Sequence, residues 1–356
     1  MLHFVIVGGS DGGISAALRA RELDRSCALS LVLADRFPNF SICGIPYFLS
    51  GEVAQANELA HRQAADIEAQ GIRLLLEHRA VRIDPDARLV DVQRPDGGLT
   101  PLPYDRLLLG TGAVSIQPRL PGADLPGVFP LRWMGDTLKL AAFLDARPET
   151  TLGAAAGVAI GRSGAFKVSR RMETNLPDVY AAGDCVETWH RVTGTHTYLP
   201  LGTTSHKQGR IAGENAVGGA REFQGSVGTQ SVRLFDLVAA RTGLHDADAR
   251  AAGLAPLSVD SEHWDHKVYY PGAKRMLIRV TGEVSTGRLL GAQIIGAYGT
   301  EVSKRVDIVA AALHQDMRVD DLNDLDLSYT PPLSSPWDPV QMAAQAWVQR
   351  WREIEA

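Results

Sequence analysis

The sequence predicts an α/β protein with a three-layer, doubly wound sheet of the Rossmann type, followed by a smaller α+β module. Two observations predict the sheet: an apolar strand at residues 2–7 that runs into a glycine-rich turn and a helix, and a second buried strand at 29–33. A third observation, further strands and then two helices from about residue 225 onward, predicts the separate module. A chain of 356 residues is long enough for two or so such domains.

The first half of the chain alternates apolar strands with helices, as a doubly wound sheet requires. After residues 2–7, the pattern predicts a helix over 12–23, a strand over 29–33, a polar helix over 54–70, strands over 72–76, 80–84 and 89–93, and a buried strand over 104–110. Prolines and glycines make 118–130 irregular, and 137–145 is predicted to be helical.

The second half begins with small residues and a short strand that ends in Gly183-Asp184. A helix is predicted over 203–216, and it stops at Gly218-Gly219. The C-terminal module is predicted to contain strands over 231–237, 268–270, 276–280 and 289–295, and helices over 302–315 and 340–351.

Composition excludes several classes of function. The net charge is -5 and no dense Lys/Arg block occurs, so nucleic acid is not an expected partner. No run of 18 apolar residues occurs, and residues 1–7 have no basic leader, so we expect a soluble, cytoplasmic protein without a signal peptide. Three cysteines are too few and too scattered for a disulfide framework or a zinc cluster, which leaves redox or nucleophilic chemistry for any functional thiol.

The turn after the first strand is a candidate dinucleotide site. Gly8, Ser10 and Gly13 occupy the positions of G-x-G-x-x-G, with serine in the middle. Serine is small, and Gly9 and Gly12 beside it preserve the turn, so the backbone can still approach a pyrophosphate. A glycine turn after a strand is also common without any ligand, so this motif needs support from its surroundings.

Asp35 and Cys43 supply that support. Asp35 ends the second strand, where a carboxylate accepts hydrogen bonds from a ribose; the alternative is an exposed turn residue beside Arg36. Cys43 follows eight residues later, and this spacing places its sulfur within reach of a flavin.

Four motifs carry a resemblance to a known family. They are FSICGIPY at 40–47, LLGTG at 108–112, VYAAGD at 179–184, and GTT at 202–204 ahead of KQGR at 207–210. With them the chain resembles the pyridine nucleotide-disulfide oxidoreductases, and within these the single-cysteine branch of coenzyme A-disulfide reductases, NADH oxidases and CoA-persulfide or polysulfide reductases. The resemblance runs from end to end with one interruption. It implies an FAD-binding domain in two segments, 1–146 and 147–224, and a C-terminal dimerisation domain at 225–356.

The resemblance also implies which residues hold FAD. Asp184 would bind the ribitol chain, Val81 would lie near the adenine, and residues 201–204 would line the isoalloxazine ring. The full expected set is Gly8, Gly9, Ser10, Gly12, Gly13, Asp35, Arg36, Ser41, Val81, Thr111, Gly112, Gly183, Asp184, Leu201, Gly202, Thr203 and Thr204.

Cys43 is the expected redox centre. Dithiol members of the family have a second cysteine where this chain has Phe48, so Cys43 must react with an external thiol, a persulfide or peroxide, giving a mixed disulfide or a sulfenic acid. A helix expected over 44–49 would stabilise the thiolate through its positive end. Cys27 and Cys185 are expected to be small packed residues.

The C-terminal module contributes two tyrosines by the same resemblance. Tyr269 in KVYYPG and Tyr329 in LSYTPP are expected to reach the partner's cysteine across a homodimer interface and to donate a proton to the leaving thiol. Tyr270 remains an alternative to Tyr269.

The identity of the substrate stays open on sequence grounds. Ile42 replaces an asparagine that is common in the CoA enzymes, and Arg19 and Arg21 keep only part of the basic pair that holds CoA phosphates in some members. CoA is one possible substrate thiol; another small thiol, a persulfide or a polysulfide remains equally open.

The interruption is the NAD(P)H-binding unit. In the family this unit follows the helix that corresponds to 137–145, but here residues 143–146 run directly into 147–152, so roughly 100 to 150 residues, one domain's worth, are missing. A natural or engineered deletion and an omitted stretch of sequence both explain this. The electron donor would then be another molecule, such as a redox protein. Rival functions are an NADH-oxidase-like reaction through a Cys43 sulfenic acid, and a flavin redox sensor or docking protein without turnover.

Overall fold

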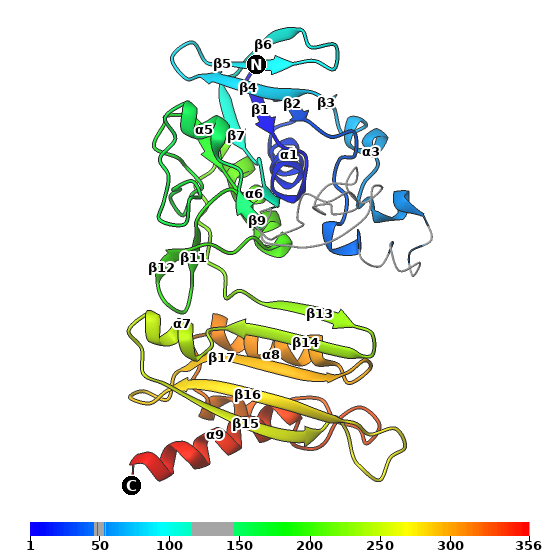
Figure 1. Cartoon of the computed structure of the whole chain (residues 1–356), viewed down its shortest axis with the longest axis vertical. Helices are drawn as coiled ribbons and strands as arrows, with labels where there is room; N and C mark the ends of the chain where they lie inside the picture. The colour runs from blue at the N-terminus through cyan, green and yellow to red at the C-terminus, as the bar shows by residue number, and fades with distance from the viewer. Residues whose placement is uncertain (46–47, 49–52, 54, 116–145, 356) are drawn as a thin grey trace, which may run out of the picture. The chain divides into compact units, whose positions relative to one another are not determined.

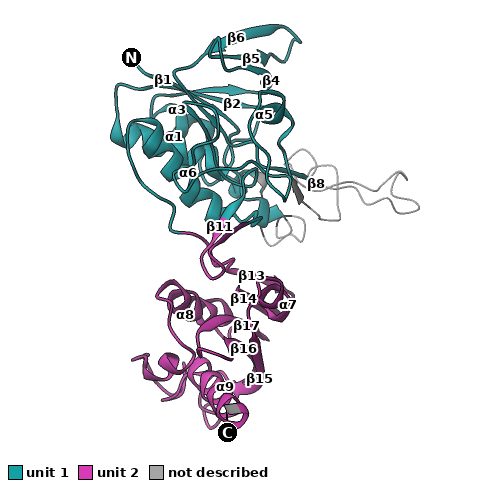
Figure 2. Ribbon diagram, turned by 90° about the vertical axis from the view of Figure 1, so that its left-hand side faces the viewer, with its two compact units in different colours: residues 1–188, 197–224 teal, residues 189–196, 225–356 magenta. Residues whose placement is uncertain are grey.

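The computed structural model of the chain describes residues 1–45, 48, 53, 55–115 and 146–355. These residues form two compact units, shown in Figure 2: unit 1 comprises 1–188 and 197–224, and unit 2 comprises 189–196 and 225–356. The assignment of FAD-binding segments to 1–146 and 147–224 and of dimerisation to 225–356 stays a prediction. No helix in the described ranges is long and apolar enough to cross a membrane.

Unit 1 is built on a five-stranded parallel sheet (Figure 1). Its order is β10 (Val179–Ala181), β7 (Arg106–Leu109), β1 (His3–Val7), β2 (Ala28–Leu33) and β3 (Ile72–Leu76), and all four neighbouring pairs are parallel. The central strands are almost continuously apolar and buried, as expected for a sheet with both faces covered. The predicted doubly wound sheet is confirmed.

Helices α1 (Asp11–Leu23) and α6 (Gly202–Ala216) pack tightly against each other in unit 1. The contact depends on two glycines of α6: a Cβ atom added to Gly209 would lie 2.1 Å from the carbonyl oxygen of Gly12, and one added to Gly213 would lie 2.2 Å from that of Ala16. Because no side chain fits there, the two helix backbones touch. Their N-terminal ends also meet, since a Cβ atom on Gly202 would lie 2.9 Å from Oδ2 of Asp11.

The predicted helix over 54–70 is wrong. The described residues of this stretch form a 3₁₀ turn, η2 (Ala56–Leu59), and a separate short helix, α3 (Ala64–Glu68). Each piece begins with its own capping box, Gln55 with Glu58 and Gln63 with Asp66. Two caps so close together start two helical turns rather than one continuous helix.

The remaining strands of unit 1 form smaller antiparallel sheets. Strands β4 (Arg79–Asp84), β5 (Leu89–Gln93) and β6 (Leu99–Pro103) form a meander; β8 (Ala113–Ser115) pairs with β9 (Ala146–Pro148); and a short helix, α5, covers Thr151–Ala155. Strand β6 was not predicted, because it contains Pro101 and Pro103; both are tolerated since β6 is an edge strand. The expectations for 118–130 and 137–145 lie outside the described residues. The hairpin strands β11 (Thr188–His190) and β12 (Thr195–Thr197) follow β10 in the chain.

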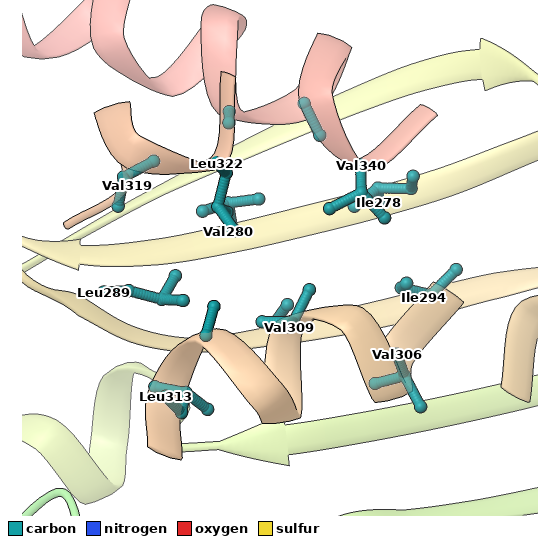
Figure 3. Close-up of a cluster of buried hydrophobic side chains, with 14 of the residues drawn as sticks. Ile278, Val280, Leu289, Ile294, Val306, Val309, Leu313, Val319, Leu322 and Val340 are labelled. Carbon is teal, nitrogen blue, oxygen red and sulfur yellow. The ribbon is translucent and has the colours of Figure 1, made fainter. Parts of the chain in front are cut away.

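Unit 2 is a five-stranded antiparallel sheet with helices on one face. The order is β13 (Gln230–Leu234), β14 (Leu237–Gly243), β17 (Leu289–Ala297), β16 (Arg275–Glu283) and β15 (Pro256–Trp264). Helix α8 (Val302–His314) packs on β14 and β17, and α9 (Pro339–Glu355) packs on β15 and β16. The short elements α7 (Asp246–Ala251) and η3 (Asp320–Asp324) complete the unit. Figure 3 shows the core between the layers, where Val306, Val309 and Leu313 of α8 point at the sheet.

Two of the predicted strands in this module need correction, and two other strands were not predicted. The strand predicted over 231–237 is interrupted: β13 ends at Leu234, Phe235 takes a left-handed conformation with φ of 53°, and β14 runs back. Strands β14 and β15 were missed. The strand predicted at 268–270 is a turn, in which the N–H of Tyr270 bonds the carbonyl of Lys267 and Gly272 has φ of 93°.

The second face of the unit 2 sheet carries exposed apolar side chains. Val232, Ala239, Ile295 and Leu277 are paired in one row across β13, β14, β17 and β16. Val232, Ile295 and Leu277 are 51%, 41% and 48% exposed, whereas Ile278 and Ile294, one residue along, are fully buried beneath the helices. Successive residues of a strand face opposite sides, so this row lies on the face away from α8 and α9.

Candidate functional site

The glycine turn between β1 and α1 leaves no room for side chains. Gly8 has φ of 113°, and a Cβ atom on it would lie 2.0 Å from the carbonyl oxygen of Gly110. A Cβ atom on Gly13 would lie 1.9 Å from the carbonyl oxygen of Gly8. Ser10 is the N-cap of α1 without a side-chain cap bond. The bare backbone at a helix N-terminus is the surface to which a dinucleotide pyrophosphate binds, so this turn fits such a cofactor.

The ends of β7 and β10 converge on the same turn. A Cβ atom on Gly12 would lie 3.3 Å from the carbonyl oxygen of Ala182, and Gly183, with φ of 89°, donates its N–H to Oε1 of Gln208 at 3.0 Å. After β7, Thr111 donates its hydroxyl to the carbonyl of Glu149 and Gly112 has φ of 72°. The carboxyl ends of parallel strands are where such folds bind their ligands.

Asp184 is held at the start of α6. Its Oδ1 accepts a hydrogen bond from Oγ of Ser205 at 2.8 Å, and its carbonyl accepts one from the hydroxyl of Tyr198 at 2.9 Å. Leu201 is the N-cap of α6, Gly202 and Thr203 are exposed in its first turn, and Thr204 is buried. The first turn of α6 and the half-buried carboxylate of Asp184 therefore lie side by side.

The residue expected at the ribose follows β2 of the parallel sheet, and the residue expected at the adenine lies in the separate sheet of β4, β5 and β6. Oδ1 of Asp35 accepts the backbone N–H groups of Arg36 at 2.6 Å and Phe37 at 3.3 Å, in the turn that follows β2. Val81 is the extra residue of a bulge in β4, because the register passes from Ala80 to Arg82, and its side chain is 42% exposed. A bulge of this kind turns backbone groups out of the ladder.

The sequence did not indicate one polar cluster at this end of unit 1. Nε2 of His206 lies 3.2 Å from Oδ1 of Asp11, and Nδ1 of His206 lies 2.7 Å from Oγ of Ser15. The ring of His61 lies edge-on to that of His206, with centroids 6.5 Å apart. The cluster joins the first turns of α1 and α6, and it exists only because the two helices pack together. Gly209 and Gly213, which allow that packing, were the only trace of it in the sequence, and they say nothing of the polar side chains.

Cys43 is exposed on an anchored turn. It is the middle residue of the 3₁₀ turn η1 (Ile42–Gly44), in which the N–H of Gly44 bonds Oγ of Ser41 at 3.1 Å. Beneath the turn, Phe40, Ile45 and Leu59 form a buried cluster, with Phe37, Ile42, Phe48 and Val53 packed against it. Residues 46, 47 and 49 of the helix expected over 44–49 lie outside the described residues.

The other two thiols are buried. Cys185 is fully buried and donates to the carbonyl oxygen of Leu109 at 3.3 Å, and burial raises its pKa to about 11. Burial also raises the pKa of Cys27. Both residues serve as packed side chains, as predicted. Cys43 is therefore the accessible sulfur of the three.

Arg19 and Arg21, the residues expected to contact CoA phosphates, have contacts within the chain. Arg19 bonds Glu214 at 2.9 Å and Glu22 at 3.0 Å, and these hydrogen bonds, led by the one from Glu214, raise its pKa. Arg21 donates to the carbonyls of Gly71 and Arg25. A role for either in substrate binding stays a prediction.

In unit 2 the structure brings the two predicted tyrosines together. A hydrogen bond with Tyr329 is the largest cause that raises the pKa of Tyr269. Tyr269 and Tyr329 are 71% and 43% exposed. The segments that carry them are also joined by the backbone, since the N–H of Lys267 bonds the carbonyl of Pro331 at 3.3 Å. Tyr270 differs, because its ring packs edge-on against that of His266.

Comparison with known proteins matches both parts of the chain. The family model of the pyridine nucleotide-disulphide oxidoreductases matches residues 2–144 and 140–209, and the model of that family's dimerisation domain matches residues 229–339. A CoA-dependent NAD(P)H sulfur oxidoreductase of Pyrococcus abyssi is 25% identical over 439 residues, covering 96% of this chain and 97% of that protein. A coenzyme A disulfide reductase of Staphylococcus haemolyticus is 24% identical, with 96% and 98% covered.

A solved structure agrees with these matches. The NAD-dependent persulfide reductase from A. fulgidus superposes with a TM-score of 0.92 at 26% identity, covering 99% of this chain and 84% of that one. The alignment with the Pyrococcus protein spans 439 positions, 83 more than the 356 residues of this chain, so the relative has a long stretch without a counterpart here. The chain belongs to the pyridine nucleotide-disulphide oxidoreductases, a family of flavin-binding oxidoreductases, and it carries that family's dimerisation domain.

Proposed function

We propose that the protein is an FAD-dependent oxidoreductase that reduces a small disulfide, persulfide or polysulfide through Cys43. One observation carries the proposal: Cys43 is exposed, while Cys27 and Cys185 are buried. Cys43 lies on an anchored turn in unit 1, the unit that also contains the glycine turn between β1 and α1. A redox-active Cys43 has no second cysteine at position 48, so its reaction partner comes from solution, and a sulfur compound is the one that this proposal assigns to it.

The glycine turn between β1 and α1 supports FAD as the particular flavin. Gly8, Gly12 and Gly13 pack against backbone carbonyls of the chain, so the turn presents bare backbone at the N-terminus of α1. Such a turn binds a pyrophosphate, which FAD has and a mononucleotide flavin lacks. Asp35 would bind the ribose, Val81 would lie beside the adenine, and Asp184 with residues 201–204 would hold the ribitol and the ring. Bound there, the cofactor supplies a pair of electrons for disulfide reduction.

The proposed reaction has two steps, an exchange at Cys43 and a reduction of the mixed disulfide that it forms. The Cys43 thiolate attacks a sulfur of the substrate, so a Cys43–sulfur bond forms, the sulfur–sulfur bond of the substrate breaks, and one thiolate leaves. Two electrons then enter the Cys43 mixed disulfide; the bond breaks, Cys43 returns to the thiolate, and the second thiol leaves with one proton. Tyr269 or Tyr329 of a second copy donates that proton.

A homodimer is therefore part of the proposal. The matched dimerisation domain and the apolar row of Val232, Ile295 and Leu277 support it, because a contiguous apolar face is buried favourably against a second copy. The substrate class is drawn from the names of the relatives and from the chemistry of an exposed thiol; CoA is one member of that class.

We infer that the NAD(P)H-binding unit is missing, either from the protein or from its recorded sequence. The excess length of the relative supports this. So does the antiparallel pair β8–β9, in which Ser115 partners Ala146, because the residues on either side of the expected insertion point are neighbours in the fold. A domain inserted there is removable without disturbing the sheet. The donor of electrons is then a molecule that needs no such unit, such as a reduced redox protein.

A second function is supported by Phe48. With no cysteine at that position, a Cys43 sulfenic acid formed by peroxide would not be converted to an internal disulfide, and its reduction would release water. This is oxidase-like or peroxidase-like chemistry. A flavin sensor or docking protein without turnover is the third possibility, and the retained pair of Tyr269 and Tyr329 argues against it.

The test begins with photoreduced holoprotein in the absence of oxygen. Mixing with CoA disulfide, glutathione disulfide or inorganic polysulfide should reoxidise the flavin with one of them, and Cys43→Ser should abolish that reaction. If none reoxidises the flavin but peroxide does, the second function replaces the first.

A separate mixing experiment tests the electron donor. NADH and NADPH should leave the oxidised flavin spectrum unchanged over seconds, while dithionite bleaches it. Rapid bleaching by either nucleotide would contradict the inferred loss of the NAD(P)H unit.

A further inference from the structure

The exposed tyrosines of unit 2 lie close to a layer of buried polar side chains, which we call the polar layer. Five polar or charged side chains lie beneath them and are each 9% exposed or less: Asp265, His266, Arg305, Ser334 and Asp338. Above them, Tyr269, Tyr270, Tyr329, Leu333 and Trp337 are between 43% and 71% exposed. Apolar side chains in this layer would pack at least as well, since buried ion pairs are often no more stabilising than hydrophobic residues of similar volume. Stability alone therefore does not explain why these buried side chains are polar.

Arg305 is at the centre of this polar layer. It lies in the first turn of α8, and its Nε bonds Oδ2 of Asp338 at 3.1 Å. Its Nη2 donates to the carbonyl of Asp265 at 2.7 Å and to that of Leu333 at 3.3 Å, and its Nη1 donates to the carbonyl of Thr300. One planar guanidinium thus joins the segment 265–272 to the segment 329–338.

Further contacts extend this anchoring within both segments. On one side, Oδ1 of Asp265 lies 3.1 Å from Nδ1 of His266, whose ring meets that of Tyr270 with centroids 6.1 Å apart. On the other side, Oγ of Ser334 donates to Oδ2 of Asp338 at 2.9 Å. Both segments are therefore anchored at buried residues close in the chain to Tyr269 and Tyr329.

We infer that Arg305 is a positioning residue, which holds the segments 265–272 and 329–338 in the arrangement that pairs Tyr269 with Tyr329. The inference rests on the proposed function, because the arrangement matters for catalysis only if this pair donates the proton to the leaving thiol. Lysine cannot replace arginine here: a single ammonium does not reproduce the planar fork that bonds Asp338 and three backbone carbonyls together.

The test compares two variants of the holoprotein on the same helix. Arg305→Lys keeps the charge beside Asp338 but loses the fork; Val309→Ala, one turn along α8, weakens the apolar core without removing a bond to either segment. The ionisation of Tyr269 is followed by NMR of isotopically labelled tyrosine and assigned with Tyr269→Phe. Arg305→Lys should move it to lower pH, towards its position in Tyr329→Phe, and Val309→Ala should leave it unchanged.

The same variants are tested for release of thiol from the Cys43 mixed disulfide. Arg305→Lys should slow release by about tenfold to 10²-fold, the scale of a small misplacement of a catalytic group, while formation of the adduct keeps its rate. Should Arg305→Lys fail to fold, Ser334→Ala serves instead, with a smaller shift in the same direction. Equal shifts in Arg305→Lys and Val309→Ala, or no shift in the folded Arg305 or Ser334 variant, would overturn the inference. If wild-type protein releases no thiol, the proposed function fails, whereas the ionisation of Tyr269 still decides the role of Arg305.

Discussion

The N–H of Lys267 bonds the carbonyl of Pro331 at 3.3 Å, and this bond joins the two segments that carry Tyr269 and Tyr329, which β16, β17 and α8 separate in the chain. Hydrogen bonding to Tyr329 raises the pKa of Tyr269, which means that the neutral phenol is stabilised relative to the phenolate. A phenol that keeps its proton at higher pH remains a proton donor over a wider range. The pairing also distinguishes Tyr269 from its neighbour Tyr270, whose ring packs on His266 instead.

The pH dependence of thiol release should follow from this pair. Tyr269→Phe should slow release by about 10²-fold and remove the alkaline limb, because the proton donor is lost. Tyr329→Phe should keep the limb but move it to lower pH, since the bond that raises the pKa of Tyr269 is gone. Tyr270→Phe is the matched control and should change neither. A limb that stays in Tyr269→Phe and disappears in Tyr270→Phe would reverse the assignment.

Thiol labelling should separate the three cysteines. At pH 8 the native protein should take up one iodoacetamide, at Cys43, because burial keeps Cys27 and Cys185 inaccessible and raises the pKa of Cys185 to about 11. Peptide mapping by mass spectrometry identifies the label. Denatured protein should take up all three, and native Cys43→Ser none. Native labelling of Cys185 at a comparable rate would be inconsistent with its burial.

The packing of α1 on α6 should be sensitive to one methyl group. Gly209→Ala places a Cβ atom against the carbonyl of Gly12, and a backbone atom yields less readily than a side chain. We expect the free energy of unfolding to fall by about 1–3 kcal/mol, more than the gain of about 1 kcal/mol from replacing glycine in a helix. Lys207→Ala, exposed on the same helix, is the control and should stay within about 0.5 kcal/mol. Denaturant titration measures both, and an unchanged midpoint for Gly209→Ala would refute the close contact.

The apolar row of unit 2 should be needed for the dimer. Leu277→Lys places a charge at the β16 end of that row, beside Glu262 of β15, where burial against a second copy would remove it from water. Light scattering after size-exclusion chromatography should show monomers for this variant and dimers for the parent. Leu99→Lys alters a more exposed leucine, 61% against 48%, on β6 in unit 1 and should remain dimeric. Dimers of Leu277→Lys at low protein concentration would show that another surface joins the copies.

Sequence patterns predicted the sheet of unit 1 well because its strands are almost wholly apolar. They failed at β13–β14, where the turn places Phe235 in a left-handed conformation that an aromatic residue seldom adopts, so no turn residue marked the boundary. Strand β15 was missed because it exposes both of its charged residues and looks like a loop. Local pattern cannot reveal such elements, since their partners in the sheet stabilise them.

The site shows the same division between local and distant information. Gly8, Gly13 and Cys43 lie in short motifs whose spacing carries their chemistry, so they could be identified from the sequence. The pairing of Asp11 with His206 depends on how two distant helices pack, and the bonds of Arg305 go to backbone carbonyls of two separate segments. A single arginine in a helix gives no sign of such partners, and only the folded chain reveals them.

The mass of the Cys43 adduct tests the proposed chemistry most directly. Protein incubated with CoA disulfide is freed of excess reagent, its intact mass is measured, and the flavin is then photoreduced without oxygen; flavin-stripped protein and Cys43→Ser receive the same treatment. The adduct should form in both proteins that contain Cys43, disappear from the holoprotein on photoreduction, and persist where the flavin has been removed. An adduct that persists in holoprotein whose flavin is fully reduced would contradict electron transfer to Cys43.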